Sequence, residues 1–113
     1  AFLECNGGWA PSWLQRMDRH WHQLGKHDAP LLTMKPSEYF KRQCVIGCEG
    51  DEADIGNVCQ LIGDDNLVFS SDYPHSDSDF PKATQEFFHQ EMPTESRRKI
   101  LWDNCVKFYG IDA

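Results

Sequence analysis

The sequence predicts an α/β fold in which short parallel strands alternate with helices. Apolar runs rich in strand-favouring residues occur at 1–5, 44–48 and 67–71, and a segment with helical periodicity follows each of them. Strands and helices that alternate in this order form a parallel sheet with right-handed crossovers. Three strands cannot close into a barrel, so we expect the sheet to keep two open edges.

Composition and charge narrow the range of functions. An apolar share of 40% and an aromatic share of 12% fit one globular domain over residues 1–113. The net charge of −7 argues against nucleic acid or an anionic membrane surface as the main partner. No apolar run approaches the ~20 residues of a membrane span. Because the sequence opens at Ala1 without an initiator methionine, we expect it to begin within a longer protein.

The cysteines predict a reducing, cytoplasmic compartment. They are odd in number and lie within apolar periodic segments, which is typical of packed free thiols. Cys44 and Cys48 would share one face of a strand, but no second close pair exists to complete a zinc site. We therefore expect neither a disulfide nor a cysteine-bound metal. The cysteines are Cys5, Cys44, Cys48, Cys59 and Cys105.

The first predicted unit is a strand over residues 1–5 that carries Glu4, followed by a turn at 6–8. Pro11 suits the first turn of a helix over residues 10–24, which Gly25 is expected to end. The apolar side chains of this helix recur at helical spacing. They are Trp13, Met17, Trp21 and Leu24.

The second unit follows a loop over residues 26–35. Ser37 is expected to cap a short helix that reaches about Arg42, ahead of the strand at 44–48. The next helix should end at Gly63. Its apolar stripe is formed by Ile55, Val58, Cys59 and Ile62.

The third unit contains the strand at 67–71 and a polar loop. Pro81 should start a helix that reaches about Gln90, and Thr94 should cap a last helix to about Tyr109. The apolar stripe of that last helix is Ile100, Leu101, Cys105 and Phe108.

Acidic side chains follow the predicted strands. Asp72 comes directly after the strand at 67–71. Glu49 or Asp51 leaves the strand at 44–48, and Glu4 lies within or just at the end of the first strand. The carboxyl ends of parallel strands meet at one edge of a sheet, where α/β proteins place their ligands. Asp72 is therefore the first candidate for a catalytic or metal-binding group. The alternative is a turn or helix-capping residue ahead of Pro74.

Other candidate residues keep two interpretations each. Glu4 fits a site residue and a structural salt bridge equally well, since buried Glu is unusual unless it is paired. Glu49 and Asp51 fit the start of a helix better than a site. His75 could contact substrate, support Asp72 or occupy a turn. Trp9 is mainly a core residue but lies near the rim and could face a ligand. The histidines expected on the surface are His20, His22, His27 and His89.

The segment Ser70-Ser71-Asp72-Tyr73-Pro74-His75, preceded by Phe69, resembles the last-strand motif of the metal-dependent amidohydrolase superfamily. The most similar branch includes enzymes like aminocarboxymuconate-semialdehyde decarboxylase. Further stretches resemble the sixth strand and its helix, the approach to the seventh strand, and the final helix of that branch. These stretches are Phe2-Leu3-Glu4 with Gly8-Trp9 and Arg16-Met17-Asp18, then Pro36-Ser37-Glu38-Tyr39-Phe40, and finally Lys99-Ile100-Leu101 with Asp103-Asn104 and Phe108-Tyr109-Gly110.

The resemblance implies that the chain is the last three units of a (β/α)8 barrel. It implies that Asp72 is a metal ligand or a proton-transfer group, with further histidine ligands upstream of Ala1. Many relatives carry a histidine on the sixth strand, where this sequence has Glu4. The implied cofactor is a divalent metal, Zn²⁺ in the first place and Mn²⁺ as the alternative. Because catalytic zinc takes three protein ligands, we expect this chain alone to bind the ion weakly and to turn over nothing.

The expected function is that of a hydrolase or decarboxylase. The intact enzyme would cleave a C–N, C–O or C–C bond of a small carboxylate or amide, with Asp72 orienting or deprotonating the attacking water. Glu4, Trp9 and His75 would line the substrate pocket. The alternative is a non-catalytic half-barrel that pairs its open sheet edges with a second copy or with the missing part of the barrel, or a degenerate relative without chemistry.

Overall fold

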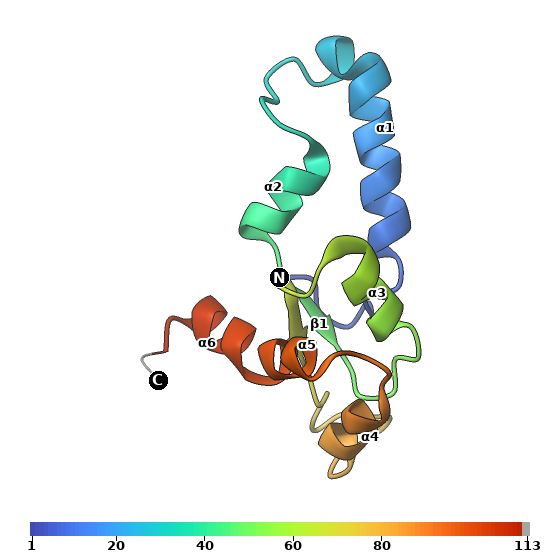
Figure 1. The fold of residues 1–113 in the computed structure, drawn as a ribbon, viewed down its shortest axis with the longest axis vertical. Helices are drawn as coiled ribbons and strands as arrows, with labels where there is room; N and C mark the ends of the chain where they lie inside the picture. The colour runs from blue at the N-terminus through green and yellow to red at the C-terminus, as the bar shows by residue number, and fades with distance from the viewer. Residues whose placement is uncertain (112–113) are drawn as a thin grey trace.

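The computed structural model describes residues 1–111, which form helices around a small parallel sheet. The order along the chain is α1 (Ala10–Asp28), α2 (Pro36–Gln43), β1 (Ile46–Cys48), α3 (Ile55–Ile62), β2 (Leu67–Phe69), α4 (Ala83–His89), α5 (Thr94–Arg98), the π-helical η1 (Lys99–Asp103) and α6 (Asn104–Tyr109) (Figure 1). None of these helices is long and apolar enough to pass through a bilayer.

β1 is the centre of the sheet. It pairs in parallel with β2, in a register that sets Ile46 opposite Leu67 and Cys48 opposite Phe69. On its other side, Phe2 forms an isolated parallel bridge, in which its N–H donates to Val45 at 2.9 Å and its carbonyl accepts from Gly47 at 2.8 Å. The predicted parallel α/β arrangement is therefore confirmed for this part of the chain.

The predicted strand over residues 1–5 is wrong beyond that bridge. Glu4 and Asn6 have φ angles of 54° and 53°, in the left-handed region, so the chain turns away from the sheet directly after Leu3. The other two strands are also shorter than predicted, because each pairs over three residues only.

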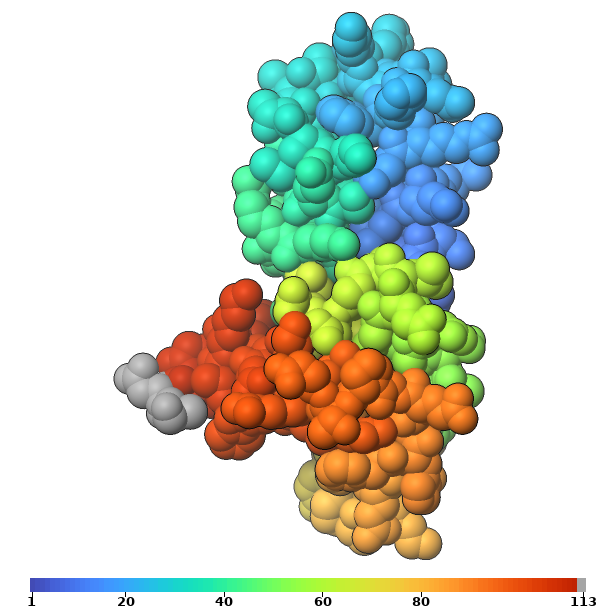
Figure 2. Space-filling view, in the orientation of Figure 1, coloured from blue at the N-terminus to red at the C-terminus, as the bar shows by residue number. Residues whose placement is uncertain are grey.

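The core lies between the sheet and its helices. Ile46, Ile55, Leu67, Phe87 and Ile100 have no exposed surface and belong to one cluster. Helix α1 packs on α2 and α3, while η1 packs on β2. The molecule is elongated, 49 × 31 × 28 Å, because α1 and α2 rise as a lobe above the sheet (Figure 2).

The lobe differs from the sequence prediction at two points. Helix α1 continues past Gly25 to Asp28, since Gly25 lies buried against the ring of Trp21, where a β-carbon would not fit. Ser37 does not cap α2. Its hydroxyl donates to Asp18 of α1 at 2.6 Å and its N–H donates to the same carboxylate at 2.9 Å, so Ser37 ties the two helices together.

The remaining helices follow the prediction more closely. Helix α3 ends at Gly63, whose φ of 88° is the conformation that favours glycine. The predicted helix from Thr94 to about Tyr109 is present as α5, η1 and α6 in direct succession. Thr94 is the first residue of this helix and not its cap. Pro93 holds the cap position, and no side chain caps the helix there. Helix α4 begins at Ala83, two residues after Pro81.

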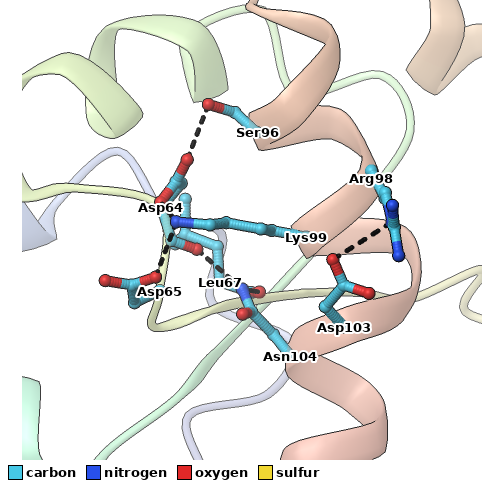
Figure 3. Close-up of polar contacts among 8 residues, drawn as sticks. All are labelled: Asp64, Asp65, Leu67, Ser96, Arg98, Lys99, Asp103 and Asn104. Atoms are coloured by element: carbon cyan, nitrogen blue, oxygen red, sulfur yellow. Dashed lines mark hydrogen bonds and ion pairs between the residues drawn. The ribbon is translucent and has the colours of Figure 1, made fainter.

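The amino end of β2 is fixed by polar side chains. Asp64, just before β2, accepts hydrogen bonds from Ser96 at 2.7 Å and from Lys99 at 2.8 Å (Figure 3). Asn104, which is buried, donates to the carbonyls of Asp64 and Leu67 at 2.7 Å each. These contacts hold the last helices against β2 and thereby fix where its carboxyl end lies.

Candidate metal centre

The acidic residues at the carboxyl ends of the strands converge on one cavity. Glu4 follows the Phe2 bridge, Glu49 follows β1, and Asp72 lies three residues past β2. Because the strands are parallel, all of these positions lie on one side of the sheet. They line a cavity of about 340 Å³ together with Ser71 and His75. The predicted rim of carboxylates is present.

Glu4, Asp72 and His75 are close enough to share one ion. Each offers a ligand atom, and these atoms lie within 4.8 Å of one another. Nδ1 of His75 lies 2.8 Å from Oδ1 of Asp72, and the N–H of His75 donates to the Asp72 carbonyl at 2.9 Å. The Asp72 side chain is 16% exposed and that of His75 is 54% exposed, and Glu4 is exposed as well, so the centre opens to solvent at Glu4 and His75.

Backbone strain marks two of these residues. Asp72 has a φ of 55° and Glu4 a φ of 54°, although neither is glycine. The left-handed conformation costs most L-residues, such as Glu4, roughly 1–2 kcal/mol, and it costs Asp less because its short side chain can hydrogen-bond locally. Strained residues of this kind cluster at functional sites, where the surrounding structure holds them in place. For Asp72, its own N–H donates to Oγ of Ser70 at 3.2 Å, which fixes the turn that points its carboxylate into the cavity.

The cavity is strongly acidic. Burial, followed by the charges of Asp72 and Glu52, raises the pKa of Glu49 above its usual range. No lysine or arginine is among the described residues that line the cavity. A cation placed between the carboxylates would relieve this repulsion.

The structure assigns Glu49 a different place from the one that the sequence favoured. Helix α3 begins at Ile55, so neither Glu49 nor Asp51 lies in its first turn. Glu49 faces the cavity, while Asp51 is exposed outside it. The helix-start interpretation is wrong for both residues.

Trp9 is not brought to this cavity. Its ring packs edge-on against the Phe40 ring, with the two ring centroids 6.4 Å apart. The centroid of the Phe2 ring lies 5.4 Å from that of Trp9. Its position is that of a packing residue between the Phe2 bridge and α2. Trp9 is not among the described residues that line the cavity, so the structure does not support the substrate contact expected for it.

The histidines outside the cavity are on the surface, as predicted. His20 and His27 pair with Asp28 at 2.8 Å and 2.7 Å at the far end of α1, and all three are exposed. His89 lies on the surface of α4, 3.4 Å from Glu86. His22 is exposed on α1.

Sequence reasoning missed Glu52. Only 8% of this residue is exposed, and its carboxylate accepts the N–H of Gly7 at 2.7 Å and the N–H of Glu49 at 2.8 Å. Burial raises its pKa, and the two backbone hydrogen bonds offset part of that rise. Glu52 lies in a polar turn without periodicity, so no pattern in the sequence marks it as buried.

Comparison with known proteins decides the family. The amidohydrolase family profile matches residues 2–111, which is nearly the whole chain. The chain belongs to the amidohydrolase family. A search of curated proteins returned no match.

Solved structures agree with the amidohydrolase fold. A 5-carboxyvanillate decarboxylase from Sphingomonas paucimobilis superposes with a TM-score of 0.75 at 24% identity, over 92% of this chain and 31% of that one. A dihydroxybenzoic acid decarboxylase from a Polaromonas species, with bound manganese and an inhibitor, gives 0.73 at 19% identity, over 93% and 32%. An amidohydrolase from Mycobacterium avium subsp. paratuberculosis gives 0.76 at 19% identity, over 97% and 27%. The chain thus spans about a third or less of each.

Proposed function

We propose that this chain supplies the last three βα units of a metal-dependent (β/α)8 enzyme. Its activity would be hydrolysis of a C–N or C–O bond, or decarboxylation, of a small carboxylate or amide. The observation that carries the proposal is the convergence of Glu4, Asp72 and His75 at the carboxyl rim, within 4.8 Å. The amidohydrolase match and the decarboxylase folds support it. The odd number of cysteines, placed within apolar segments, supports a reducing, cytoplasmic location.

The donor set fits a divalent metal. Carboxylate oxygens suit Mn²⁺ and imidazole suits Zn²⁺, and the centre combines two carboxylates with one imidazole. Glu4, Asp72 and His75 would hold the ion in this part of the barrel. A bound ion would activate a water molecule or polarise a substrate carboxylate or carbonyl.

The chain's own residues would position the reacting groups. Asp72 is placed to orient a water molecule or to take its proton, because its carboxylate is mostly buried and points into the cavity. His75 holds the Asp72 carboxylate through the 2.8 Å contact at Nδ1. Glu4 and Glu49 also line the cavity and add to its negative charge.

Metal titration tests the centre. With ¹⁵N-labelled chain, Mn²⁺ should broaden the signals of residues near Glu4, Asp72 and His75 before all others, at weak, millimolar affinity. Calorimetry with Zn²⁺ and Mn²⁺ should likewise show weak binding and no turnover. The Asp72→Asn variant should lose the site-specific broadening. Asp77→Asn is the matched control, since Asp77 is an exposed acid of the same loop and its loss removes the same charge.

Two outcomes would contradict parts of this proposal. Uniform broadening, or broadening that Asp72→Asn leaves unchanged, would rule out the metal centre. A tight one-to-one site on the chain alone would rule out the expectation that the remaining ligands lie elsewhere in the barrel.

A second candidate function is assembly without catalysis. The specific observation is the exposure of large apolar side chains next to open sheet edges. Leu3, the residue after the Phe2 bridge, is 63% exposed. Among the described residues, β2 pairs on one edge only. Such edges favour pairing with a second copy or with the rest of the barrel. Sedimentation measurements separate these cases, because a stable monomer would argue against edge pairing and a dimer would support it.

A further inference from the structure

Glu52 joins two loops that carry the acidic residues of the cavity. Its Oε2 accepts the N–H of Gly7, three residues after Glu4, and its Oε1 accepts the N–H of Glu49 itself. The two loops come from different βα units, 45 residues apart for the Gly7 contact. A single buried carboxylate therefore fixes the distance between the loop of Glu4 and the loop of Glu49.

The buried carboxylate of Glu52 lowers the stability of the fold. Among the ion pairs of residues 1–111, none involves Glu52, so no lysine, arginine or histidine neutralises it. A buried charge without an opposite charge lowers stability, and burial accordingly raises the pKa of Glu52. Glu52 accepts hydrogen bonds only from backbone N–H groups of two site loops. It therefore contributes more to the geometry of these loops than to the stability of the core.

Packing around Gly7 requires the same geometry. A β-carbon on Gly7 would lie 2.9 Å from Cδ1 of Ile55, a fully buried residue of α3. The Gly7 loop therefore sits directly on α3, within reach of Glu52. The hydrogen bond to Glu52 and the contact with Ile55 constrain the same stretch of backbone, and Glu4 lies at its start.

We propose that Glu52 is a positioning residue: by tying the Glu4 loop to the Glu49 loop, it keeps Glu4 at the rim, where Glu4, Asp72 and His75 would bind a divalent metal. This inference rests on the proposed metal centre. Glu52 does not face the cavity, so it acts through the two backbone N–H groups that it accepts. Outer residues that orient metal ligands typically change affinity by 10–100-fold when they are replaced.

The test is Mn²⁺ titration of the full chain and of the Glu52→Gln variant, read from NMR line broadening at His75. Gln has nearly the same shape, but only its single oxygen can accept an N–H, so one of the two loops is released. We expect an affinity at least about tenfold lower, with faster amide exchange at Gly7 or Glu49. The control is Asp51→Asn, which removes the same charge from an exposed neighbour and should leave affinity unchanged.

A second variant keeps the test decisive if Glu52→Gln does not fold. Gly7→Ala leaves the carboxylate in place but pushes the loop away from Ile55, so it should weaken Mn²⁺ binding as well. Absence of site-specific broadening in the unchanged chain would overturn the metal centre itself. Broadening in the unchanged chain, with full affinity retained in folded Glu52→Gln or Gly7→Ala, would overturn the positioning role alone.

Discussion

The two ends of the sheet treat buried acids in opposite ways. At the amino end of β2, Asp64 has a hydroxyl donor and an ammonium donor, from Ser96 and Lys99 (Figure 3). At the carboxyl end, Glu49 and Glu52 have no cation among the described residues. Within residues 1–111, the same fold thus contains an acid paired with a cation at one end of the sheet and two acids without one at the other, of which Glu49 lines the cavity and Glu52 lies outside it.

The pKa values follow this difference. Burial alone would raise the pKa of Asp64, but the hydrogen bonds from Lys99 and Ser96 bring it below its usual value. Burial raises the pKa of Glu52 and of Glu49, and no cation lowers either of them. An acid that is stabilised in its charged form strengthens the fold, whereas the buried charges of Glu49 and Glu52 lower its stability.

The amino end should dominate stability, and Asn104→Ala tests this most strongly. The variant leaves the carbonyls of Asp64 and Leu67 without the donor that each has at 2.7 Å. The Leu67 carbonyl would be left buried and unsatisfied, which costs ~1–3 kcal/mol. The Asp64 carbonyl would keep only the N–H of Leu67 at 3.4 Å, so the free energy of unfolding should fall by about 2–3 kcal/mol in total. Urea unfolding measures it. A loss below that of a typical surface substitution would show that this end does not anchor the fold.

Replacing the paired acid should have the next largest effect. Asp64→Asn removes the charged acceptor of Ser96 and Lys99, and the unfolding free energy should fall by about 1 kcal/mol. Asp65→Asn is the matched control, because Asp65 also lies 2.8 Å from Lys99 but is 72% exposed. Its effect should be smaller. Equal losses for the two variants would mean that burial of Asp64 adds nothing.

The pH dependence of the unfolding free energy shows whether the charges of Asp64 and Glu52 stabilise or destabilise the fold. The folded pKa of Asp64 lies below its usual 3.8, so its stabilisation is complete above that pH and is lost as the pH falls through the folded pKa. The difference in unfolding free energy between the wild-type chain and Asp64→Asn should therefore shrink only in strong acid. The folded pKa of Glu52 lies above its usual 4.5, so its cost is present at neutral pH and disappears as the pH falls towards 4.5.

Much of the fold could be predicted from the sequence because its signals are local. Helix α3 and the segment from Thr94 to Tyr109 have apolar stripes at helical spacing, and Gly63 ends α3 as expected. The first strand could not be predicted. Its apolar residues fit a strand, but the left-handed turn at Glu4 depends on contacts with a loop far along the chain.

The site could be predicted in part, for a similar reason. Asp72 and His75 lie on one loop after a clear strand, and parallel order alone brings Glu4 to the same rim. The buried state of Glu52 depends on a hydrogen bond with Gly7, 45 residues away, which no local pattern carries. Trp9 packs against Phe40, in keeping with its main interpretation as a core residue. The sequence could not separate this role from a ligand contact, because the packing depends on how α2 returns to the sheet.

The smallest expected effect has the opposite sign and sharpens the contrast between the two ends. Glu4→Gly removes a left-handed strain of ~1–2 kcal/mol, less the greater freedom of glycine in the unfolded chain, roughly 0.5–1 kcal/mol. Stability should rise by about 0.5 kcal/mol in urea unfolding while Mn²⁺ affinity falls. Asn6→Gly is the matched control, since Asn6 has a φ of 53° on the same loop but lies outside the metal centre. It should change stability little, because Asn tolerates the left-handed region, and it should keep Mn²⁺ binding. If Glu4→Gly also kept its Mn²⁺ binding, the strain at Glu4 would have no connection with the site.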